Sequence, residues 1–270
     1  RLKEGYTILP SMRQLALYVA TNTNQNFSFA SELGWLMASE VIASGLDISF
    51  APVLDLDIET SSIISDRSFG KNPTTVINIA NEFIEGMNDA GMKATGKHFP
   101  GHGGIYTDTH LTFSEDQRSL DELQLSDLRP FQELQHKLGG IMTAHISFPE
   151  IDINIATFSK YWLQNTLREQ MKFKGEIISD DLSMKGTDFI GGIDDKVNKA
   201  LESGCTMILI CNDRSAALQA LRFMEKQNIS YSPTLISLKA SKKVSWDKLE
   251  NDPRRLDIID KINKLNLEIA

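Results

Sequence analysis

Short apolar runs alternate along the chain with longer segments in which hydrophobic residues recur at helical spacing. The apolar runs predict strands at residues 46–56, 92–99, 141–148, 176–182 and 205–211. The longer segments predict helices at residues 73–91, 119–140, 161–172, 196–202 and 215–227. The segment 119–140 should be interrupted near Pro130. Strands and helices that alternate in this way are typical of a parallel sheet joined by crossover helices.

A closed α/β barrel and a doubly wound open sheet both fit this order of elements. Polar residues follow strand after strand, namely Asp55, Lys97, His98, His145, Asp180, Asp181, Asn212 and Asp213. The carboxyl ends of barrel strands carry the active site, so this clustering favours a (β/α)8-like TIM barrel. No Pro/Gly/Ser-rich linker divides the strands, and we expect residues 1–270 to form one catalytic barrel domain. In the tail, Leu256, Ile259, Ile262 and Leu265 predict the apolar face of a packing helix.

Composition and charge exclude two classes of partner. No apolar run approaches the roughly 20 residues that span a membrane. The net charge of -8 argues against a broad nucleic-acid surface, which needs a basic face. The two cysteines, Cys205 and Cys211, lie in one apolar run and predict buried thiols without a disulfide, as in a reducing cytoplasm. No signal peptide is visible in the sequence, and we expect a cytoplasmic location.

The stretch "KHFPGHGGIYTDTH", residues 97–110, holds three of the five histidines of the chain. Lys97 and His98 end a predicted strand, and the Pro-Gly-His-Gly sequence that follows predicts a turn. Asp108 and His110 come next, and an aspartate beside a histidine fixes its tautomer and raises its basicity. This pair is therefore a candidate proton shuttle.

Three other interpretations of this stretch remain open. It could be a polar loop held by internal hydrogen bonds. His98, His102, Asp108 and His110, with His145, could instead bind zinc in a metal-dependent barrel hydrolase, although the spacing matches no specific zinc motif. A phosphate loop fits poorly because "GHGG" lacks the GK[ST] ending.

Two further stretches carry candidate site residues. Asp180 and Asp181 end a predicted buried strand and should point to opposite sides, so one faces the barrel mouth while the other braces the loop. A structural cap is the alternative for either acid. Arg67, in "DRSFG", could pair with a carboxylate or bind a substrate oxygen.

In their order along the chain, these motifs resemble the family 3 glycoside hydrolases, and more narrowly the bacterial β-N-acetylglucosaminidases that recycle cell wall. The resemblance rests on "APVLDLD", "DRSFG", "KHFPGHG" followed by "DTH", "MTAH" and "SDDLSM". It implies a retaining mechanism in which Asp180 is the nucleophile and His110, with Asp108 as partner, is the general acid/base. Arg67, Lys97 and His98 match residues that hold the sugar.

The resemblance also implies a substrate and its handling. We expect an exo-acting enzyme that removes terminal N-acetylglucosamine from GlcNAc-1,6-anhydro-MurNAc-peptides, without metal or organic cofactor and as a monomer. A sugar-binding module without turnover is a further interpretation. Similar enzymes begin with additional strands and a "DxEGG"-like motif, so we expect N-terminal strands of the barrel to be missing from a chain that starts at Arg1.

Overall fold

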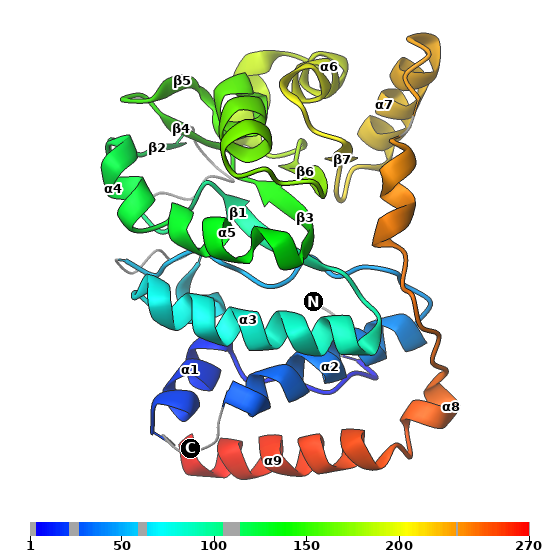
Figure 1. The fold of residues 1–270 in the computed structure, drawn as a ribbon. Helices are drawn as coiled ribbons and strands as arrows, with labels where there is room; N and C mark the ends of the chain where they lie inside the picture. The colour runs from blue at the N-terminus through cyan, green and yellow to red at the C-terminus, as the bar shows by residue number, and fades with distance from the viewer. Residues whose placement is uncertain (1–3, 22–26, 59–63, 105–113, 231, 270) are drawn as a thin grey trace.

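The computed structural model describes residues 4–21, 27–58, 64–104, 114–230 and 232–269 (Figure 1). Its main sheet contains four parallel strands in the order β1 (Ala94–Phe99), β3 (Leu138–Thr143), β6 (Glu176–Asp181) and β7 (Met207–Leu209). Residues 51–54 run along the free edge of β1, where Val53 bridges Lys97 and the Leu54 amide donates to the Lys97 carbonyl at 2.7 Å.

This strand order distinguishes a closed α/β barrel from a doubly wound open sheet, the two architectures that both fit the sequence. Each parallel segment pairs with the next one along the chain, whereas a doubly wound sheet reverses its order at a switch point. The TIM-barrel-like α/β fold predicted from the strand ends is therefore confirmed. A smaller sheet joins β2 (Ser114–Glu115), β4 (Ile146–Phe148) and β5 (Asp152–Ile155), in which β2 and β4 are parallel and β4 and β5 antiparallel.

Helices surround the sheet and extend beyond it on one side. Their bounds are α1 Met12–Thr21, α2 Phe27–Ala43, α3 Pro73–Ala90, α4 Leu120–Leu125, α5 Leu128–Leu134, α6 Ile193–Ser203, α7 Arg214–Lys226, α8 Trp246–Leu249 and α9 Pro253–Ile269. A π-helix spans Tyr161–Gln170, and short 3₁₀ turns lie at Ser65–Arg67, Gln135–Lys137, Ala156–Phe158, Lys185–Ile190 and Pro233–Leu238. Figure 1 shows α9, α2, α3 and α5 stacked in that order toward the sheet.

The caps of α3 show how the sequence fixes one of these helices. The Asn72 side chain accepts from the amides of Thr74 and Thr75, and Pro73 occupies the first turn, where a missing N–H costs nothing. Gly91 ends the helix with a φ of +95°, a conformation that favours glycine. The helix predicted at residues 73–91 is confirmed.

Several predicted elements have different bounds in the structure. The strand predicted at 141–148 is wrong as one unit: it divides at Ala144 into β3 and β4, which belong to different sheets. The helix predicted at 119–140 breaks at Ser126, not at Pro130, which lies in the first turn of α5. Residues 46–56 are extended but form only the Val53 bridge, and the run 205–211 contributes only the three residues of β7.

Two glycines bring α2 and α3 into close contact. A Cβ atom at Gly34 would collide with the Phe83 carbonyl oxygen, and one at Gly86 would collide with the Ser31 carbonyl oxygen. The backbones of the two helices therefore touch directly at this crossing. Neither glycine has a positive φ, so close approach and not conformation requires them.

The C-terminal helix α9 packs on α2 with most of the predicted apolar face. Ile262 and Leu265 are buried as predicted and Ile259 is half-buried, whereas Leu256 is 51% exposed and Ile258 is buried in its place. Polar contacts reinforce the packing: Arg255 pairs with buried Glu40, which also accepts from the amide and hydroxyl of Thr7.

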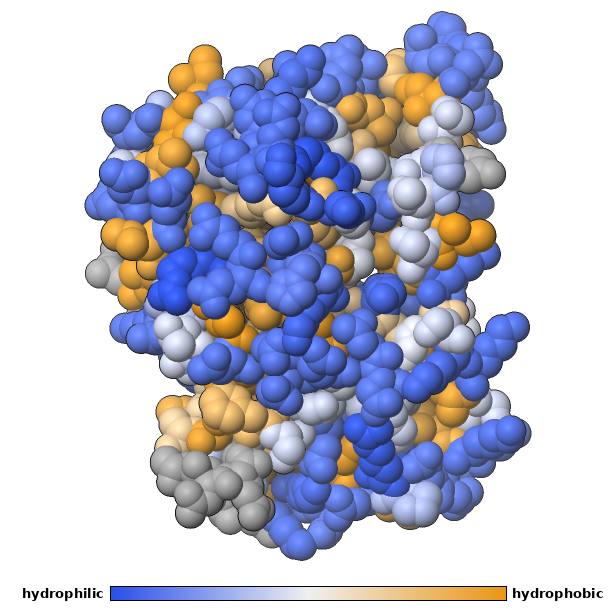
Figure 2. Space-filling model, in the orientation of Figure 1, coloured by the Kyte–Doolittle hydropathy of each residue, from blue (hydrophilic) through white to orange (hydrophobic). Residues whose placement is uncertain are grey.

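The surface drawn in Figure 2 is mainly hydrophilic, with hydrophobic residues scattered between polar ones. None of the helices in the described part of the chain is long and apolar enough to cross a membrane. Both cysteines are free, Cys205 buried and Cys211 half-buried, which agrees with the predicted absence of a disulfide.

Candidate active site

The candidate site lies where parallel segments end side by side. Asp55 follows the extended segment at 51–54, Lys97 and His98 lie near the end of β1, His145 follows β3, and Asp180 lies near the end of β6. Because neighbouring parallel strands end at the same edge of a sheet, these residues share one end of the barrel wall. The fold thus brings together residues from four separate stretches of sequence.

Asp180 is half-buried at the centre of this group. Burial by itself would raise the pKa of Asp180, but His98, His145, the Asp181 amide and Lys97 together outweigh burial and hold the pKa below its ordinary value. The Asp181 amide donates to Oδ1 of Asp180 at 2.8 Å. Asp180 is therefore a carboxylate at neutral pH, and the lysine that favours its charge, Lys97, belongs to β1.

Asp181 has a different task from its neighbour. Its Oδ1 accepts from the amide of Ser183 at 2.9 Å, from the hydroxyl of Ser183 at 2.7 Å and from the amide of Cys211 at 2.9 Å. These bonds tie the loop after β6 to the loop after β7. The prediction that one of the two acids braces the loop is confirmed, and Asp181 is that acid.

Asp55 is fully buried and holds the turn that follows β1. Its Oδ1 accepts from the backbone amides of His98 at 3.0 Å and His102 at 2.9 Å, and its Oδ2 lies 2.7 Å from Nδ1 of His98. Burial opposes the charge on Asp55, but these two histidines outweigh it and lower the pKa of Asp55. The carboxylate therefore places the proton of His98 on Nδ1 and leaves Nε2 for another partner.

His102 and His145 are both buried and neutral. Burial lowers the pKa of His102 to about 4, even though the charges of Asp55 and Asp180 act to raise it. Burial also lowers the pKa of His145. The Nε2 of His145 lies 3.1 Å from the Asp181 carbonyl and its Nδ1 lies 2.8 Å from the Thr157 hydroxyl, so a neutral ring donates from Nε2 and accepts at Nδ1. These bonds attach the loop after β3 to the end of β6 at Asp181.

Arg67 and Lys97 are the other two residues predicted to hold a ligand. Lys97 is half-buried on β1, and its charge helps to lower the pKa of Asp180. Arg67 is exposed at the end of the turn Ser65–Arg67. The following Ser68 donates its hydroxyl to the Asp55 carbonyl at 2.7 Å, so the "DRSFG" turn is attached to the same strand end as Asp55.

The pair predicted to move a proton, Asp108 and His110, lies outside the described residues and stays a prediction. The described flanks, Gly104 and Ser114, belong to the turn after β1 and to β2. Among the residues that the structure describes, no three or more His, Cys, Asp or Glu side chains are grouped to hold a metal ion. Both ring nitrogens of His145, one of the five potential metal ligands, already contact Thr157 and Asp181.

Sequence reasoning missed the roles of Asp55 and His145 in this site. Asp55 was recognised only as a polar residue at a strand end, and its partner His98 lies 43 residues away in sequence. Its place in "APVLDLD" is the one signal that could have indicated it. His145 was considered as a polar residue at a strand end and as a metal ligand, and nothing in "MTAH" indicates that Thr157 and Asp181 contact its ring.

An ionised carboxylate flanked by lysine and histidine side chains is suited to attack an electrophilic carbon of a polar, hydroxylated ligand. Comparisons with known proteins identify the chemistry. Residues 1–233 match the family described as glycosyl hydrolase family 3 N terminal domain. The chain belongs to glycosyl hydrolase family 3. It is a glycoside hydrolase whose curated relatives are named β-hexosaminidase.

Two of these relatives show the extent of the match. The β-hexosaminidase of Idiomarina loihiensis is 48% identical over 221 residues, which cover 82% of this chain and 66% of that protein. The β-hexosaminidase of Pseudomonas aeruginosa is 42% identical over 267 residues, which cover 99% of this chain and 79% of that protein. The chain therefore spans about two thirds to four fifths of the length of these relatives.

Solved structures agree with the sequence relatives. NagZ from Neisseria gonorrhoeae, in complex with N-trifluoroacetyl-D-glucosamine, is 33% identical with a TM-score of 0.87, over 97% of this chain and 77% of that chain. A family 3 β-N-acetylglucosaminidase from Paenibacillus is 27% identical with a TM-score of 0.84, over 98% of this chain and 53% of that chain. These relatives support a β-N-acetylglucosaminidase activity.

Proposed function

We propose that the chain is the catalytic part of an exo-β-N-acetylglucosaminidase that cleaves terminal N-acetylglucosamine with retention of anomeric configuration. The observation that carries the proposal is the environment of Asp180. It is a carboxylate of lowered pKa at the end of a barrel strand, surrounded by His98, His145 and Lys97. Retaining glycosidases need such an ionised nucleophile opposite a proton donor.

In the first step, an Asp180 oxygen attacks the anomeric carbon while the bond from that carbon to the leaving oxygen breaks. A covalent glycosyl-enzyme ester results, and the departing oxygen takes a proton from the general acid. Water then attacks the same carbon, gives its proton to the same group and releases Asp180 as a carboxylate. The lowered pKa keeps Asp180 charged for the first step and makes it a good leaving group in the second.

His110 is the proposed proton donor, with Asp108 as the partner that orients its ring. A histidine with an ordinary pKa near ~6.5 exchanges protons readily at neutral pH, so the strongly raised pKa of a buried carboxylic acid is not needed. Both assignments rest on the resemblance of the "DTH" motif.

Lys97, His98 and Arg67 are proposed to hold the sugar. The Nε2 of His98 is available to a hydroxyl group because Asp55 occupies Nδ1. Lys97 supplies a positive charge that helps to lower the pKa of Asp180, and Arg67 is exposed on the turn attached to Asp55. The Neisseria relative carries an N-acylated glucosamine in its solved complex, which supports an N-acetylglucosamine substrate.

The finer substrate assignment extends the resemblance further. We propose that the sugar is removed from peptidoglycan fragments of the GlcNAc-1,6-anhydro-MurNAc-peptide type. A cytoplasmic location and a monomeric state belong to the same proposal.

A turnover assay on the whole protein that contains this chain tests the proposal. Aryl β-N-acetylglucosaminide and aryl β-glucoside are compared side by side, with and without a chelator. We expect hydrolysis of the first substrate, little hydrolysis of the second and no effect of the chelator. Activity lost on chelation and restored by zinc would instead favour a metal-dependent hydrolase, and a structure of the Neisseria relative with a zinc ion makes this control worthwhile. Binding of N-acetylglucosamine without turnover would indicate a sugar-binding module.

A further inference from the structure

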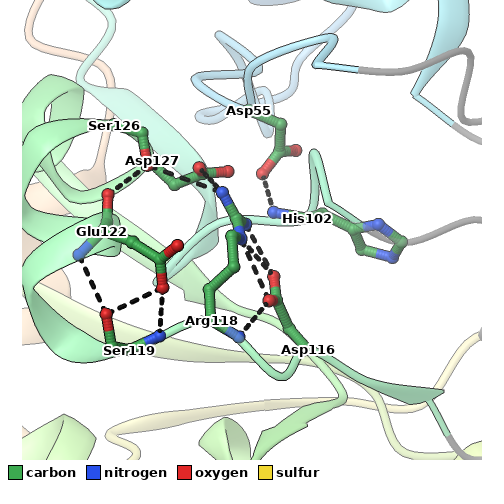
Figure 3. Close-up of polar contacts among 8 residues, drawn as sticks. All are labelled: Asp55, His102, Asp116, Arg118, Ser119, Glu122, Ser126 and Asp127. Atoms are coloured by element: carbon green, nitrogen blue, oxygen red, sulfur yellow. Dashed lines mark hydrogen bonds and ion pairs between the residues drawn. The ribbon is translucent and has the colours of Figure 1, made fainter.

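Arg118 lies at the centre of a buried cluster of charges beside the turn that follows β1 (Figure 3). Its Nε is 3.0 Å from both carboxylate oxygens of Asp116, and its Nη2 is 2.6 Å from Oδ2 of the same residue. Its Nη1 is 2.6 Å from Oδ2 of Asp127. The side chains of Asp116 and Asp127 are only 3% and 0% exposed, so one guanidinium joins two buried acids.

The two acids belong to different parts of the fold. Asp116 follows β2, and its amide donates to the Ser147 carbonyl on β4 at 2.9 Å. Asp127 precedes the first residue of α5. Arg118 therefore ties the end of β2 to the start of α5, and a substitution at Arg118 would remove this link.

The same cluster supports the glycine turn at residues 101–104. A Cβ atom at Gly101 would collide with the side chain of Asp127, and one at Gly104 would lie 2.7 Å from Nη2 of Arg118 and 2.8 Å from Oδ2 of Asp116. On its other side, the turn is held by Asp55, which accepts the amide of His102 at 2.9 Å. The glycines let the turn lie directly on the ion cluster, so the position of the turn depends on the cluster.

The pKa values of Asp127 and Arg118 both depend on the ion pairs within this cluster. Burial raises the pKa of Asp127 and the charge of Arg118 opposes that rise. Burial also opposes the charge on Arg118, but its bonds and charges with Asp116 and Asp127 outweigh burial and raise the pKa of Arg118. Removal of the guanidinium would leave two buried acids without a positively charged partner, which is strongly unfavourable.

Residues 105–113 are attached to the chain at Gly104 and at Ser114, and both attachments lie next to this cluster. We infer that Arg118, through Asp116 and Asp127, is a positioning residue that sets the start and the end of the segment carrying Asp108 and His110. The inference rests on the proposed role of His110 as general acid/base. Arg118 acts through the turn and β2 and does not touch the reacting atoms.

A positioning role and a merely structural role make different kinetic predictions. If Arg118 only stabilises the fold, its loss lowers the amount of active protein and affects every substrate by the same factor. If it places the general acid, its loss harms substrates with poor leaving groups most, because these need protonation and activated aryl oxides do not. The dependence of kcat/KM on leaving-group pKa therefore separates the two roles.

The experiment uses four single variants and one double variant of the whole protein. Each is assayed with a series of aryl β-N-acetylglucosaminides and with a disaccharide. Arg118→Met removes the positive charge and keeps most of the side-chain volume. Asp127→Asn is a milder change to the same cluster, and it serves as the test if Arg118→Met does not fold. Arg129→Met is the matched control, because it breaks the partly exposed Arg129–Glu133 pair on α5, the helix that Asp127 precedes. His110→Ala provides the reference for loss of the acid.

We expect Arg118→Met to lower kcat/KM for the disaccharide by about a hundredfold, the effect of a misplacement near 1 Å, and for the most activated substrate by less than about threefold. Asp127→Asn should show a smaller effect of the same kind, and Arg129→Met none. In the His110→Ala background, Arg118→Met should steepen the leaving-group dependence no further. Equal losses for all substrates, or additive losses in the double variant, would overturn the inference alone. A parent protein without turnover, or a His110→Ala variant with the parent dependence, would overturn the proposed function as well.

Discussion

The carboxylate of Asp55 forms two hydrogen bonds with His98. Its Oδ2 lies 2.7 Å from Nδ1 of the His98 ring, and its Oδ1 accepts from the His98 backbone amide at 3.0 Å. One fully buried side chain thereby fixes the tautomer, the ring direction and the backbone position of a proposed sugar-binding residue. The relationship connects two motifs, "APVLDLD" and "KHFPGHG", that are 43 residues apart at this pair.

Asp55→Asn should therefore weaken substrate binding more than the chemical step. The amide oxygen can still accept from the backbone, but the amide nitrogen cannot accept the Nδ1 proton of His98, so the ring loses its orientation. We expect KM for an aryl β-N-acetylglucosaminide to rise about tenfold or more, as expected for a misplaced contact, with a smaller fall in kcat. Steady-state kinetics of parent and variant measure this. A variant with the parent KM would show that His98 does not depend on Asp55.

The free energy of unfolding should decrease as the pH is lowered, because two buried histidines stay neutral in the folded chain. Burial lowers the pKa of His102 to about 4 and also lowers that of His145, whereas both titrate near ~6.5 when unfolded. As pH falls below about 6.5, the unfolded chain binds protons that the folded chain does not, and the free energy of unfolding decreases. His102 alone should contribute a loss of about 2 kcal/mol by pH 5, and its contribution stops changing below about pH 4.

Urea unfolding at pH 7.5 and pH 5 measures this loss. His102→Gln should reduce the pH dependence, and His136→Gln, which removes an exposed imidazole, is the matched control. Equal pH dependence in the parent and in His102→Gln would contradict the burial of a neutral His102.

The glycine crossing of α2 and α3 predicts an unusual response to alanine. In an ordinary helix, Gly→Ala stabilises by about 1 kcal/mol. At Gly34 the new methyl group would collide with the Phe83 carbonyl of α3, so the helices must separate. We expect Gly34→Ala to destabilise by about 1–3 kcal/mol, the usual range for overpacking.

Thermal or urea unfolding measures the effect, with Gly192→Ala as control. A Cβ atom at Gly192 would lie 3.7 Å from Oδ2 of Asp195, an ordinary contact distance, and the substitution should cost less than about 1 kcal/mol at this N-cap. A stabilised Gly34→Ala variant would contradict the close crossing.

The elements that the sequence predicted well are those with local signals. Asn72, Pro73 and Gly91 mark both ends of α3, and the polar residues after successive strands indicated a barrel. The alternation of side chains along a strand indicated that one of Asp180 and Asp181 would brace the loop, and Asp181 does so.

The remaining features depend on contacts between distant segments. Hydrophobicity alone does not separate β3 from β4, because both are apolar and the chain changes sheet at Ala144. The buried face of α9 is set by its packing on α2, and its spacing alone did not exclude Leu256. The sequence around Asp55 does not distinguish it from other acids at strand ends, and only the fold brings His98 and His102 next to it.

The two adjacent acids should respond differently to removal. Asp180→Ala should lower kcat for an aryl β-N-acetylglucosaminide by several orders of magnitude, because no other group is proposed to form the ester, and it should leave the fold intact. Asp181→Ala should destabilise the loops after β6 and β7, because three hydrogen bonds are lost, and should retain measurable turnover. Kinetics combined with thermal unfolding of both variants test this, and comparable kcat losses would contradict the separate roles.

The most direct test of the account is to trap the covalent intermediate. A 5-fluoro-N-acetylglucosaminyl fluoride slows the second step, so the sugar should accumulate on the nucleophile, and peptide mass analysis after proteolysis locates it. We predict one sugar on the peptide that contains "SDDLSM", attached to Asp180, and no label in Asp180→Ala. A sugar on Asp181, or turnover of the reagent without any labelled residue, would contradict it.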